Sequence, residues 1–167
     1  MRYNLAMIGI LSDSHDNVTH LRAAVRMFRA AGCDLVVHAG DFVAPFTARV
    51  LAGLGCPVQA VYGNCDGEKA GLADALEPCG FIQAAPLVFE HGGRRILVTH
   101  LNLPAAEFAA RQVYDLVIFG HTHKPEVRRE GKTLLINPGE TGGWVTGRST
   151  AAFYDPTTDE AHIVAVS

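Results

Sequence analysis

The feature that most constrains the fold is an alternation of short apolar runs with amphipathic segments in the first part of the chain. The apolar runs predict buried strands, and the amphipathic segments carry apolar residues at helical spacing. The predicted order is strand 5–11, helix 18–31, strand 35–37, helix 46–54 and strand 58–61. Gly32 ends the first helix. This pattern is typical of a parallel or mixed sheet covered by helices.

After residue 80 the sequence changes to a hairpin pattern. His91-Gly92-Gly93 is a turn signal between two apolar runs, and a short helix is predicted at 104–111. The strands predicted in this half are 87–90, 95–99, 116–119, 133–136, 150–154 and 161–166. Together the two halves predict an α/β fold of the two-sheet αββα sandwich type.

Length and composition exclude several classes of protein. The chain has 167 residues, is 49% hydrophobic and carries a net charge of −3, so it has too much apolar surface for a disordered segment. We expect a single domain over residues 1–167, since this length suits one core. No run of Lys or Arg exceeds a pair, as in Arg94-Arg95, which argues against an extensive nucleic-acid surface.

Cysteine usage and hydropathy indicate the compartment. The four cysteines form no C-x-x-C pair, so we expect a reducing compartment, the cytoplasm. We interpret Cys33, Cys56 and Cys79 as small buried hydrophobic residues. No stretch approaches the roughly 20 apolar residues that span a bilayer. The sequence leaves homo-oligomerisation open.

Polar side chains of metal-ligand type follow five of the predicted strands. Because functional groups of α/β sheets gather outside the carboxyl ends of strands, residues distant in the sequence can meet at one point. The five segments are Asp13-Ser14-His15, Gly40-Asp41, Gly63-Asn64-Cys65-Asp66, Thr99-His100 and Gly120-His121-Thr122-His123. The sequence therefore predicts one metal-binding site built from scattered segments.

Spacing and residue type refine this prediction. In Asp13-x-His15 and His121-x-His123 one residue separates the two side chains, so in extended backbone both would point to the same side. A glycine precedes several of these residues, where it lets the backbone turn or approach closely. Oxygen and imidazole ligands without thiolate suit Mn, Fe, Zn, Co or Ni, and manganese is our working expectation.

Each segment alone has a simpler interpretation. Asp13, or Asp16 with Thr19, could cap the helix that begins near Val18. Asn64 could be a turn residue and His38 a histidine packed in the sheet. Only the joint pattern favours a metal site.

The ordered motifs D-x-H, G-D, G-N, a strand-end H and G-H-x-H, over residues 5 to about 140, resemble those of the calcineurin-like metallophosphoesterases. They are most similar to the small bacterial and archaeal phosphodiesterase branch, where G-N-C-D also occurs. The resemblance implies a fold of that type and two divalent metal ions. One ion would be held by Asp13, His15, Asp41 and His123, and the other by Asp41, Asn64, His100 and His121, with Asp41 bridging.

The implied activity is that of a dinuclear metal-dependent phosphoesterase, a phosphodiesterase acting on a small phosphodiester. A hydroxide bridging the metals would attack phosphorus, because two cations lower the pKa of bound water. Asp41, Asn64, His100 and Cys65 are the residues assigned to catalysis. Cys65 stands where much of the superfamily has a histidine, and a thiol can donate a proton but cannot supply positive charge, so efficient phosphomonoester cleavage is not expected.

Two further features and three alternatives remain at this stage. Asn137-Pro138-Gly139 resembles a loop near the site in the same branch, and Glu140 could wall the pocket with Arg148. The retromer scaffold subunit shares the implied fold and binds proteins, so a non-catalytic scaffold is one alternative. A phosphomonoesterase or nucleotidase is another. A structural metal site is the third, and it is disfavoured because such sites usually hold one ion in a closed tetrahedron, often with thiolate ligands. Neither the natural substrate nor the native metal follows from the sequence.

Overall fold

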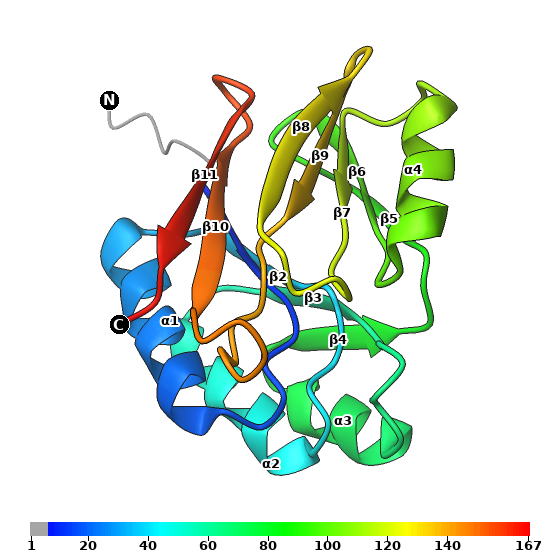
Figure 1. Ribbon diagram of the computed structural model, residues 1–167. Helices are drawn as coiled ribbons and strands as arrows, with labels where there is room; N and C mark the ends of the chain where they lie inside the picture. Colours follow the sequence, from blue (N-terminus) through cyan, green and yellow to red (C-terminus); the bar gives the residue numbers. More distant parts are fainter. Residues whose placement is uncertain (1–6) are drawn as a thin grey trace.

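The computed structural model describes residues 7–167 and contains two β-sheets (Figure 1). Within this part of the chain the first sheet has six strands in the order β11-β10-β1-β2-β3-β4. Strands β1 to β4 are mutually parallel, and β10 joins β1 antiparallel. Their bounds are β1 (Ile8–Leu11), β2 (Leu35–His38), β3 (Val58–Val61), β4 (Gly80–Gln83), β10 (Thr150–Asp155) and β11 (Glu160–Ala165).

The second sheet has five strands in the described residues, in the order β5-β6-β7-β9-β8. Strands β6, β7 and β9 are parallel, and β5 and β8 are antiparallel at the edges. Their bounds are β5 (Leu87–His91), β6 (Arg94–Val98), β7 (Leu116–Ile118), β8 (Glu126–Glu130) and β9 (Thr133–Asn137). In both sheets, therefore, parallel central strands end at a common edge.

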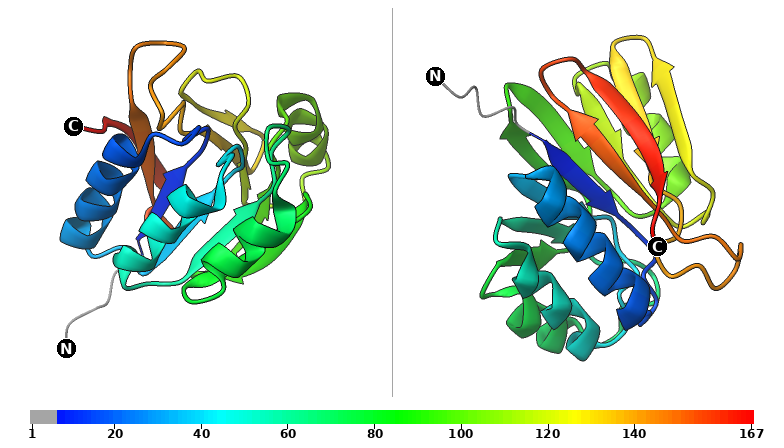
Figure 2. Two further views of the ribbon diagram at one scale, coloured as in Figure 1. Left: turned by 90° about the horizontal axis from the view of Figure 1, so that it is seen from below. Right: turned by 90° about the vertical axis from the view of Figure 1, so that its left-hand side faces the viewer.

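The helices cover the outer faces of the two sheets (Figure 2). Leu21, Phe28 and Leu51 lie in the core between the first sheet and its helices, and Ala105 and Ala109 lie in a core against the second sheet. The elements are α1 (Val18–Ala31), α2 (Pro45–Ala48), the 3₁₀ helix η1 (Arg49–Leu54), α3 (Lys69–Leu76) and α4 (Asn102–Ala110). Among the described residues α4 is the one helix that covers the second sheet, and the other face of that sheet packs on the first sheet.

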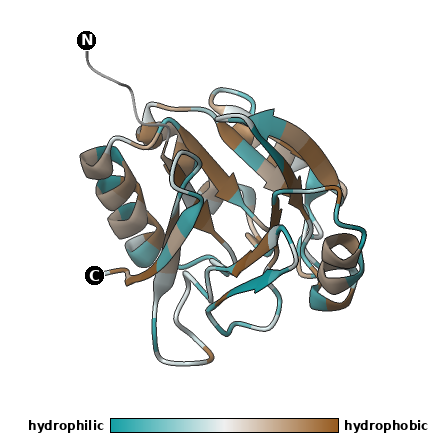
Figure 3. Cartoon of the chain, turned by 90° about the horizontal axis from the view of Figure 1, so that it is seen from above, coloured by the Kyte–Doolittle hydropathy of each residue, from teal (hydrophilic) through white to brown (hydrophobic). Residues whose placement is uncertain are grey.

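The core between the sheets is built from β-branched and leucine side chains. Ile10 and Val37 of the first sheet share it with Ile96, Ile118 and Ile136 of the second, all without solvent exposure. Each such side chain contributes about 1.5–3 kcal/mol by its burial. Hydrophobic residues accordingly concentrate along the strands (Figure 3). The predicted αββα sandwich is confirmed.

Helix α1 spans the predicted residues, but its N-terminal cap differs from the expectation. Asn17 is the cap, and its side-chain oxygen accepts a hydrogen bond from the N–H of His20 at 3.2 Å. Asp16 instead accepts hydrogen bonds from the Ala44 N–H and the Thr47 hydroxyl, so it ties the next loop to the first. The structure therefore excludes the simpler alternative in which Asp13, or Asp16 with Thr19, caps this helix.

Other elements were predicted imperfectly. The segment expected as one helix over 46–54 divides into α2 and η1, and the strand expected over 5–11 begins within the described residues only at Ile8. Elements α3, β4 and β8 were not predicted. Gly71 lies within α3 and weakens its helical pattern, and β8 (Glu126-Val-Arg-Arg-Glu130) has one apolar residue. Neither segment therefore carries a strong periodic signal. Residues 5 and 6 of the predicted strand lie outside the described residues.

The prediction that three cysteines are buried meets the structure only in part. Cys33, Cys56 and Cys79 are half-buried rather than buried, each at the border of a core. No helix among residues 7–167 has the length and apolar character needed to cross a membrane. The extent of the domain, residues 1–167, stays a prediction.

Candidate metal centre

The seven predicted metal ligands lie where the carboxyl ends of strands from both sheets meet. Asp13 and His15 follow β1, Asp41 follows β2 and Asn64 follows β3, while His100 follows β6 and both His121 and His123 follow β7. The loops are joined by backbone hydrogen bonds, such as Asp13 N–H to Gly40 O at 2.9 Å. The structure thus brings all seven side chains to one place.

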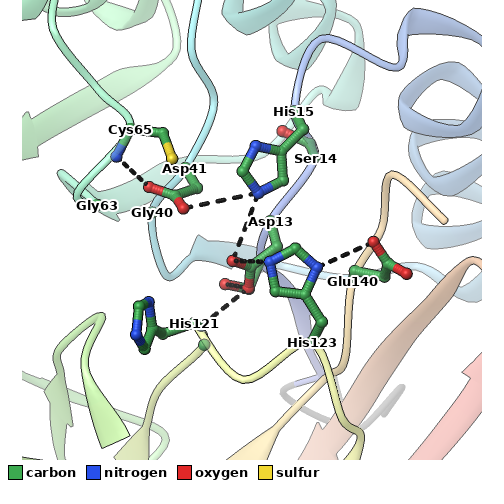
Figure 4. A network of polar contacts seen from close by, with 12 residues as sticks. Asp13, Ser14, His15, Gly40, Asp41, Gly63, Cys65, His121, His123 and Glu140 are labelled. Atoms are coloured by element: carbon green, nitrogen blue, oxygen red, sulfur yellow. Dashed lines mark hydrogen bonds and ion pairs between the residues drawn. The ribbon is translucent and has the colours of Figure 1, made fainter. Parts of the chain in front are cut away.

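One group consists of Asp13, His15 and His123, whose rings and carboxylate converge (Figure 4). The Nε2 atom of His123 lies 3.4 Å from Asp13 Oδ1, and the Nε2 atom of His15 lies 3.8 Å from the same oxygen. The two imidazole rings stack with centroids 5.1 Å apart. Asp13 is completely buried and is fixed by a hydrogen bond of 2.6 Å from the Ser12 hydroxyl to Oδ2.

A second group consists of Asn64, His100 and His121. The Oδ1 atom of Asn64 lies 2.9 Å from His100 Nε2 and 2.9 Å from His121 Nδ1. His100 donates its Nδ1–H to the carbonyl oxygen of Ala39 at 2.8 Å, which fixes the ring and directs Nε2 toward the site. His121 therefore groups with Asn64 rather than with His123.

Asp41 stands between the two groups. Its Oδ2 atom is 3.6 Å from His15 Nε2 and 3.4 Å from His100 Nε2. Its other oxygen accepts a hydrogen bond from the Cys65 N–H at 2.8 Å. One carboxylate thus faces both groups.

The backbone that carries these side chains differs from the expectation. Asp13 and His15 have φ of 51° and 39°, and His121 and His123 have φ of 69° and 60°, so both pairs lie in the left-handed region and not in extended backbone. Asp41 shares this conformation, with φ of 62°. Such backbone costs about 1–3 kcal/mol per residue and concentrates at functional sites. Tight turns and not extended strands therefore bring Asp13 and His15 together, whereas His121 and His123 belong to different groups.

Close packing explains two of the glycines. A Cβ on Gly63 would overlap the Asp41 carboxylate, and a Cβ on Gly120 would overlap the Ser12 hydroxyl and approach Asp13 Oδ2 at 2.7 Å. The expectation that glycine permits close approach at these two positions is confirmed.

The electrostatics of the centre fit a cation. Among the described residues, Asp13 Oδ1 and His15 Nε2 are buried side-chain atoms with no hydrogen-bond partner, and both face the centre. Unpaired buried polar atoms are costly, and a cation would satisfy both. The neighbouring Asp13 and Asp41 carboxylates raise the pKa of His15 despite its burial. Burial opposes ionisation of Asp41, but the nearby His100 imidazole and the hydrogen bond from the Cys65 N–H hold its pKa well below the usual range.

Glu140 supports the centre from behind His123. It is completely buried, and its Oε2 lies 3.0 Å from His123 Nδ1 (Figure 4). The N–H groups of Val145 and Thr146 and the Thr146 hydroxyl donate to the same carboxylate. Burial acts to raise its pKa, but these hydrogen bonds lower it to about 2, so Glu140 is ionised. An ionised carboxylate on Nδ1 directs the Nε2 lone pair of His123 into the centre.

This role of Glu140 corrects the sequence interpretation. Glu140 does not wall a pocket with Arg148, which is exposed, but orients His123. Asn137 of the predicted loop donates to the Gly120 carbonyl at 2.9 Å and so holds the turn before His121. The only sequence signal for either residue was its place in the loop after Ile136.

Asp66 was also missed as a structural support. It is buried, and its carboxylate accepts hydrogen bonds from the N–H groups of Asp41, Val43 and Gly63. It therefore locks the loop after β2 to the loop after β3. Its position in Gly63-Asn64-Cys65-Asp66 was the available signal.

His38 and Cys65 both lie near the centre, but His38 is buried and Cys65 is exposed. His38 is buried in the sheet as expected, accepts a hydrogen bond from the Gly40 N–H on Nδ1, and has its pKa lowered to about 3 by burial. Cys65 is exposed, and its sulfur can share a site with His15 and Asp41. Although the residue is exposed, neighbouring atoms partly remove water from its sulfur, and this together with the charge of Asp41 raises the pKa of the thiol to about 11. The Cys65 thiol is therefore protonated at neutral pH.

Comparison with known proteins decides the family. The model of the calcineurin-like phosphoesterase superfamily domain matches residues 7–159. The chain belongs to this superfamily. It is 34% identical over 152 residues to phosphodiesterase MJ0936 of Methanocaldococcus jannaschii, which covers 89% of this chain and 92% of the relative. The predicted superfamily and its small archaeal and bacterial branch are confirmed.

Solved structures agree on the phosphoesterase fold. A structure described as a novel archaeal phosphodiesterase superimposes with a TM-score of 0.90 at 32% identity, covering 95% of this chain and 99% of that one. Vacuolar protein sorting 29 from Cryptosporidium parvum superimposes with a TM-score of 0.70 at 17% identity, covering 96% of each chain. The second likeness shows the fold alone.

Proposed function

We propose that this phosphoesterase is a dinuclear metal-dependent phosphodiesterase that hydrolyses a small phosphodiester. The observation that supports it most is the position of Asp41, whose Oδ2 lies close to a donor atom of each group, His15 Nε2 at 3.6 Å and His100 Nε2 at 3.4 Å. Asp13, His15 and His123 would hold one divalent cation, and Asn64, His100 and His121 the other, with Asp41 shared. Imidazole, carboxylate and amide donors suit Mn, Fe, Zn, Co or Ni, and we propose manganese.

When bound, the two cations would lower the pKa of a water molecule so that it attacks phosphorus, and would neutralise charge on the phosphoryl oxygens. The chain's own contribution is to hold the donors in place before substrate arrives. The Ala39 carbonyl orients His100, Glu140 orients His123, and Ser12 fixes Asp13. These contacts fix the ring tautomers so that Nε2 of both histidines carries a lone pair toward the centre.

Cys65 is the candidate acid for the leaving group. Its sulfur lies beside the donors, and its raised pKa keeps the proton available at neutral pH. A neutral thiol adds no positive charge, so it favours substrates whose single negative charge needs less compensation. This supports a diester over a dianionic monoester.

Two alternatives remain. The likeness to vacuolar protein sorting 29 fits a non-catalytic protein-binding scaffold, but only at the level of fold. A phosphomonoesterase or nucleotidase would need an acid stronger than the Cys65 thiol. The cytoplasm stays a prediction, and so does the lack of an extensive nucleic-acid surface.

The test is hydrolysis of bis(p-nitrophenyl) phosphate by metal-reconstituted protein. We expect Asp41→Asn to abolish turnover, while Asp74→Asn, on the exposed face of α3, keeps the wild-type rate. Equal rates from the wild type and Asp41→Asn would remove the proposal. An inactive wild type that still binds metal would favour the scaffold.

A further inference from the structure

A cavity of about 420 Å³ opens beside the second group of donors. Asn64 and His100 belong to its lining, together with Leu101 and with Pro104 and Phe108 of α4. This volume lies within the roughly 300–1,000 Å³ of small-molecule sites. A substrate whose phosphorus lies at the metal centre would therefore have a ready place for one of its two ester groups.

The remaining walls of the cavity are mostly apolar, and the hydroxyls of Tyr62 and Thr99 are the polar groups among them. These walls come from four segments and include two aromatic rings: Tyr62, Pro86, Leu101, Pro104 and Phe108. Leu101 is 43% exposed, so part of its apolar side chain is accessible to a molecule in the cavity. His100 is the one titratable imidazole of the lining, and no carboxylate, lysine or arginine belongs to it.

Neighbouring groups hold both rings in place. The Tyr62 hydroxyl donates to the carbonyl oxygen of Lys69 at 2.9 Å, and the Lys69 ammonium lies 5.5 Å from the ring centroid. The Arg111 guanidinium lies 4.8 Å from the centroid of Phe108, which packs edge-on against Tyr114. Because the Tyr62 hydroxyl already has a partner, the cavity offers few free hydrogen-bonding groups to a sugar.

We propose that this cavity, which we call the aryl pocket, binds a planar apolar group esterified to the phosphate. The substrate class is then a phosphodiester with an aromatic or nucleobase-sized substituent. This inference rests on the proposed function. Planar groups gain from aromatic walls through offset or edge contacts, whereas a polar alcohol would lose hydrogen bonds to water there.

Calorimetric binding of two phosphonates to the metal-loaded protein tests the pocket without turnover. Methylphosphonate presents the charged group alone, and phenylphosphonate adds one ring. We expect phenylphosphonate to bind about tenfold more tightly, the gain of one well-packed ring. Adenosine 5′-monophosphate as a third probe distinguishes sources, since tighter binding than phenylphosphonate would indicate a nucleobase and weaker binding a simple aryl group.

Variants locate the preference. Phe108→Leu keeps most of the volume and so the fold, and Leu101→Ala changes an exposed residue; each should reduce the preference for phenylphosphonate by at least threefold and leave methylphosphonate unchanged. Phe46→Ala, an exposed phenylalanine of α2 outside the pocket, is the matched control. Equal affinities of the two phosphonates, or a preference that both pocket variants retain, would overturn the proposal.

The two proposals fail separately. Equal affinity of the wild type for the two phosphonates, with diester hydrolysis intact, would reject the aryl pocket alone. Absence of diester hydrolysis by the wild type would reject the proposed function, whatever the phosphonates show.

Discussion

Replacing Glu140 by glutamine should weaken metal binding at one of the two proposed sites. Glu140 is buried, and its carboxylate accepts a hydrogen bond from His123 Nδ1 at 3.0 Å. It also accepts three hydrogen bonds from Val145 and Thr146. Glutamine keeps the shape but removes the charge. It also places an NH₂ group where a donor already points, so at least one of these hydrogen bonds is lost.

The magnitude follows from these contacts. A hydrogen bond to a charged group contributes about 1.5–3 kcal/mol, against about 0.5–1.5 kcal/mol for a neutral one. Exchanging the charged partner of His123 for a neutral one should cost the difference between these ranges, about 1–1.5 kcal/mol of metal-binding free energy. This is a roughly tenfold loss of affinity, at the lower end of the 10–100-fold typical when the group that orients a histidine ligand is changed.

The assay is titration of the protein with metal, followed by calorimetry or competition with a chelator. We expect two binding steps in the wild type, and in Glu140→Gln a weakening of the step that involves Asp13, His15 and His123. Glu160→Gln, at an exposed residue that begins the edge strand β11 of the first sheet, is the control. If Glu140→Gln binds both equivalents with wild-type affinity, the argument that Glu140 orients a metal ligand is refuted.

Three further predictions concern other parts of the centre. Cys65→His should raise monoester hydrolysis relative to diester hydrolysis with the same leaving group, because an imidazolium adds positive charge; steady-state rates on p-nitrophenyl esters measure the ratio, and a fall would count against the role of Cys65. Gly120→Ala should destabilise the fold by about 1–3 kcal/mol in urea denaturation, since its Cβ meets Ser12 and Asp13, whereas Gly67→Ala, with open space around it, should change little; equal effects would refute the packing argument. Removal of metal by a chelator should lower the thermal midpoint, because a ligand at 100 times its Kd adds about 2.7 kcal/mol to stability, and an unchanged midpoint would contradict a folded-state metal site.

The sequence was most informative where strands end. Asp13 and Asp41 could be placed together because the parallel strands before them share a carboxyl edge, and the structure brings His100 to the same place from the second sheet. The local geometry was not predictable, since the left-handed backbone of His121 and His123 follows from loop packing and not from any periodic pattern.

Contacts between distant segments were also beyond sequence reasoning. The pairing of Glu140 with His123 depends on how the loop after β9 folds back onto the loop after β7.

The grouping of basic residues was not predictable either. The sequence has only pairs of adjacent basic residues, although four arginines gather in a groove of about 430 Å³. Helical spacing brings three of them to one face of α1, and the fourth comes from η1: Arg22, Arg26, Arg29 and Arg49.

The most direct test of the account is a crystal structure of the metal-loaded protein with anomalous scattering data. The account predicts two anomalous peaks about 3.5–4 Å apart, as in other two-metal sites, on either side of Asp41. Asp13, His15 and His123 would bind one ion, and Asn64, His100 and His121 the other. A single peak enclosed by four protein ligands, or two peaks that do not share Asp41, would contradict it.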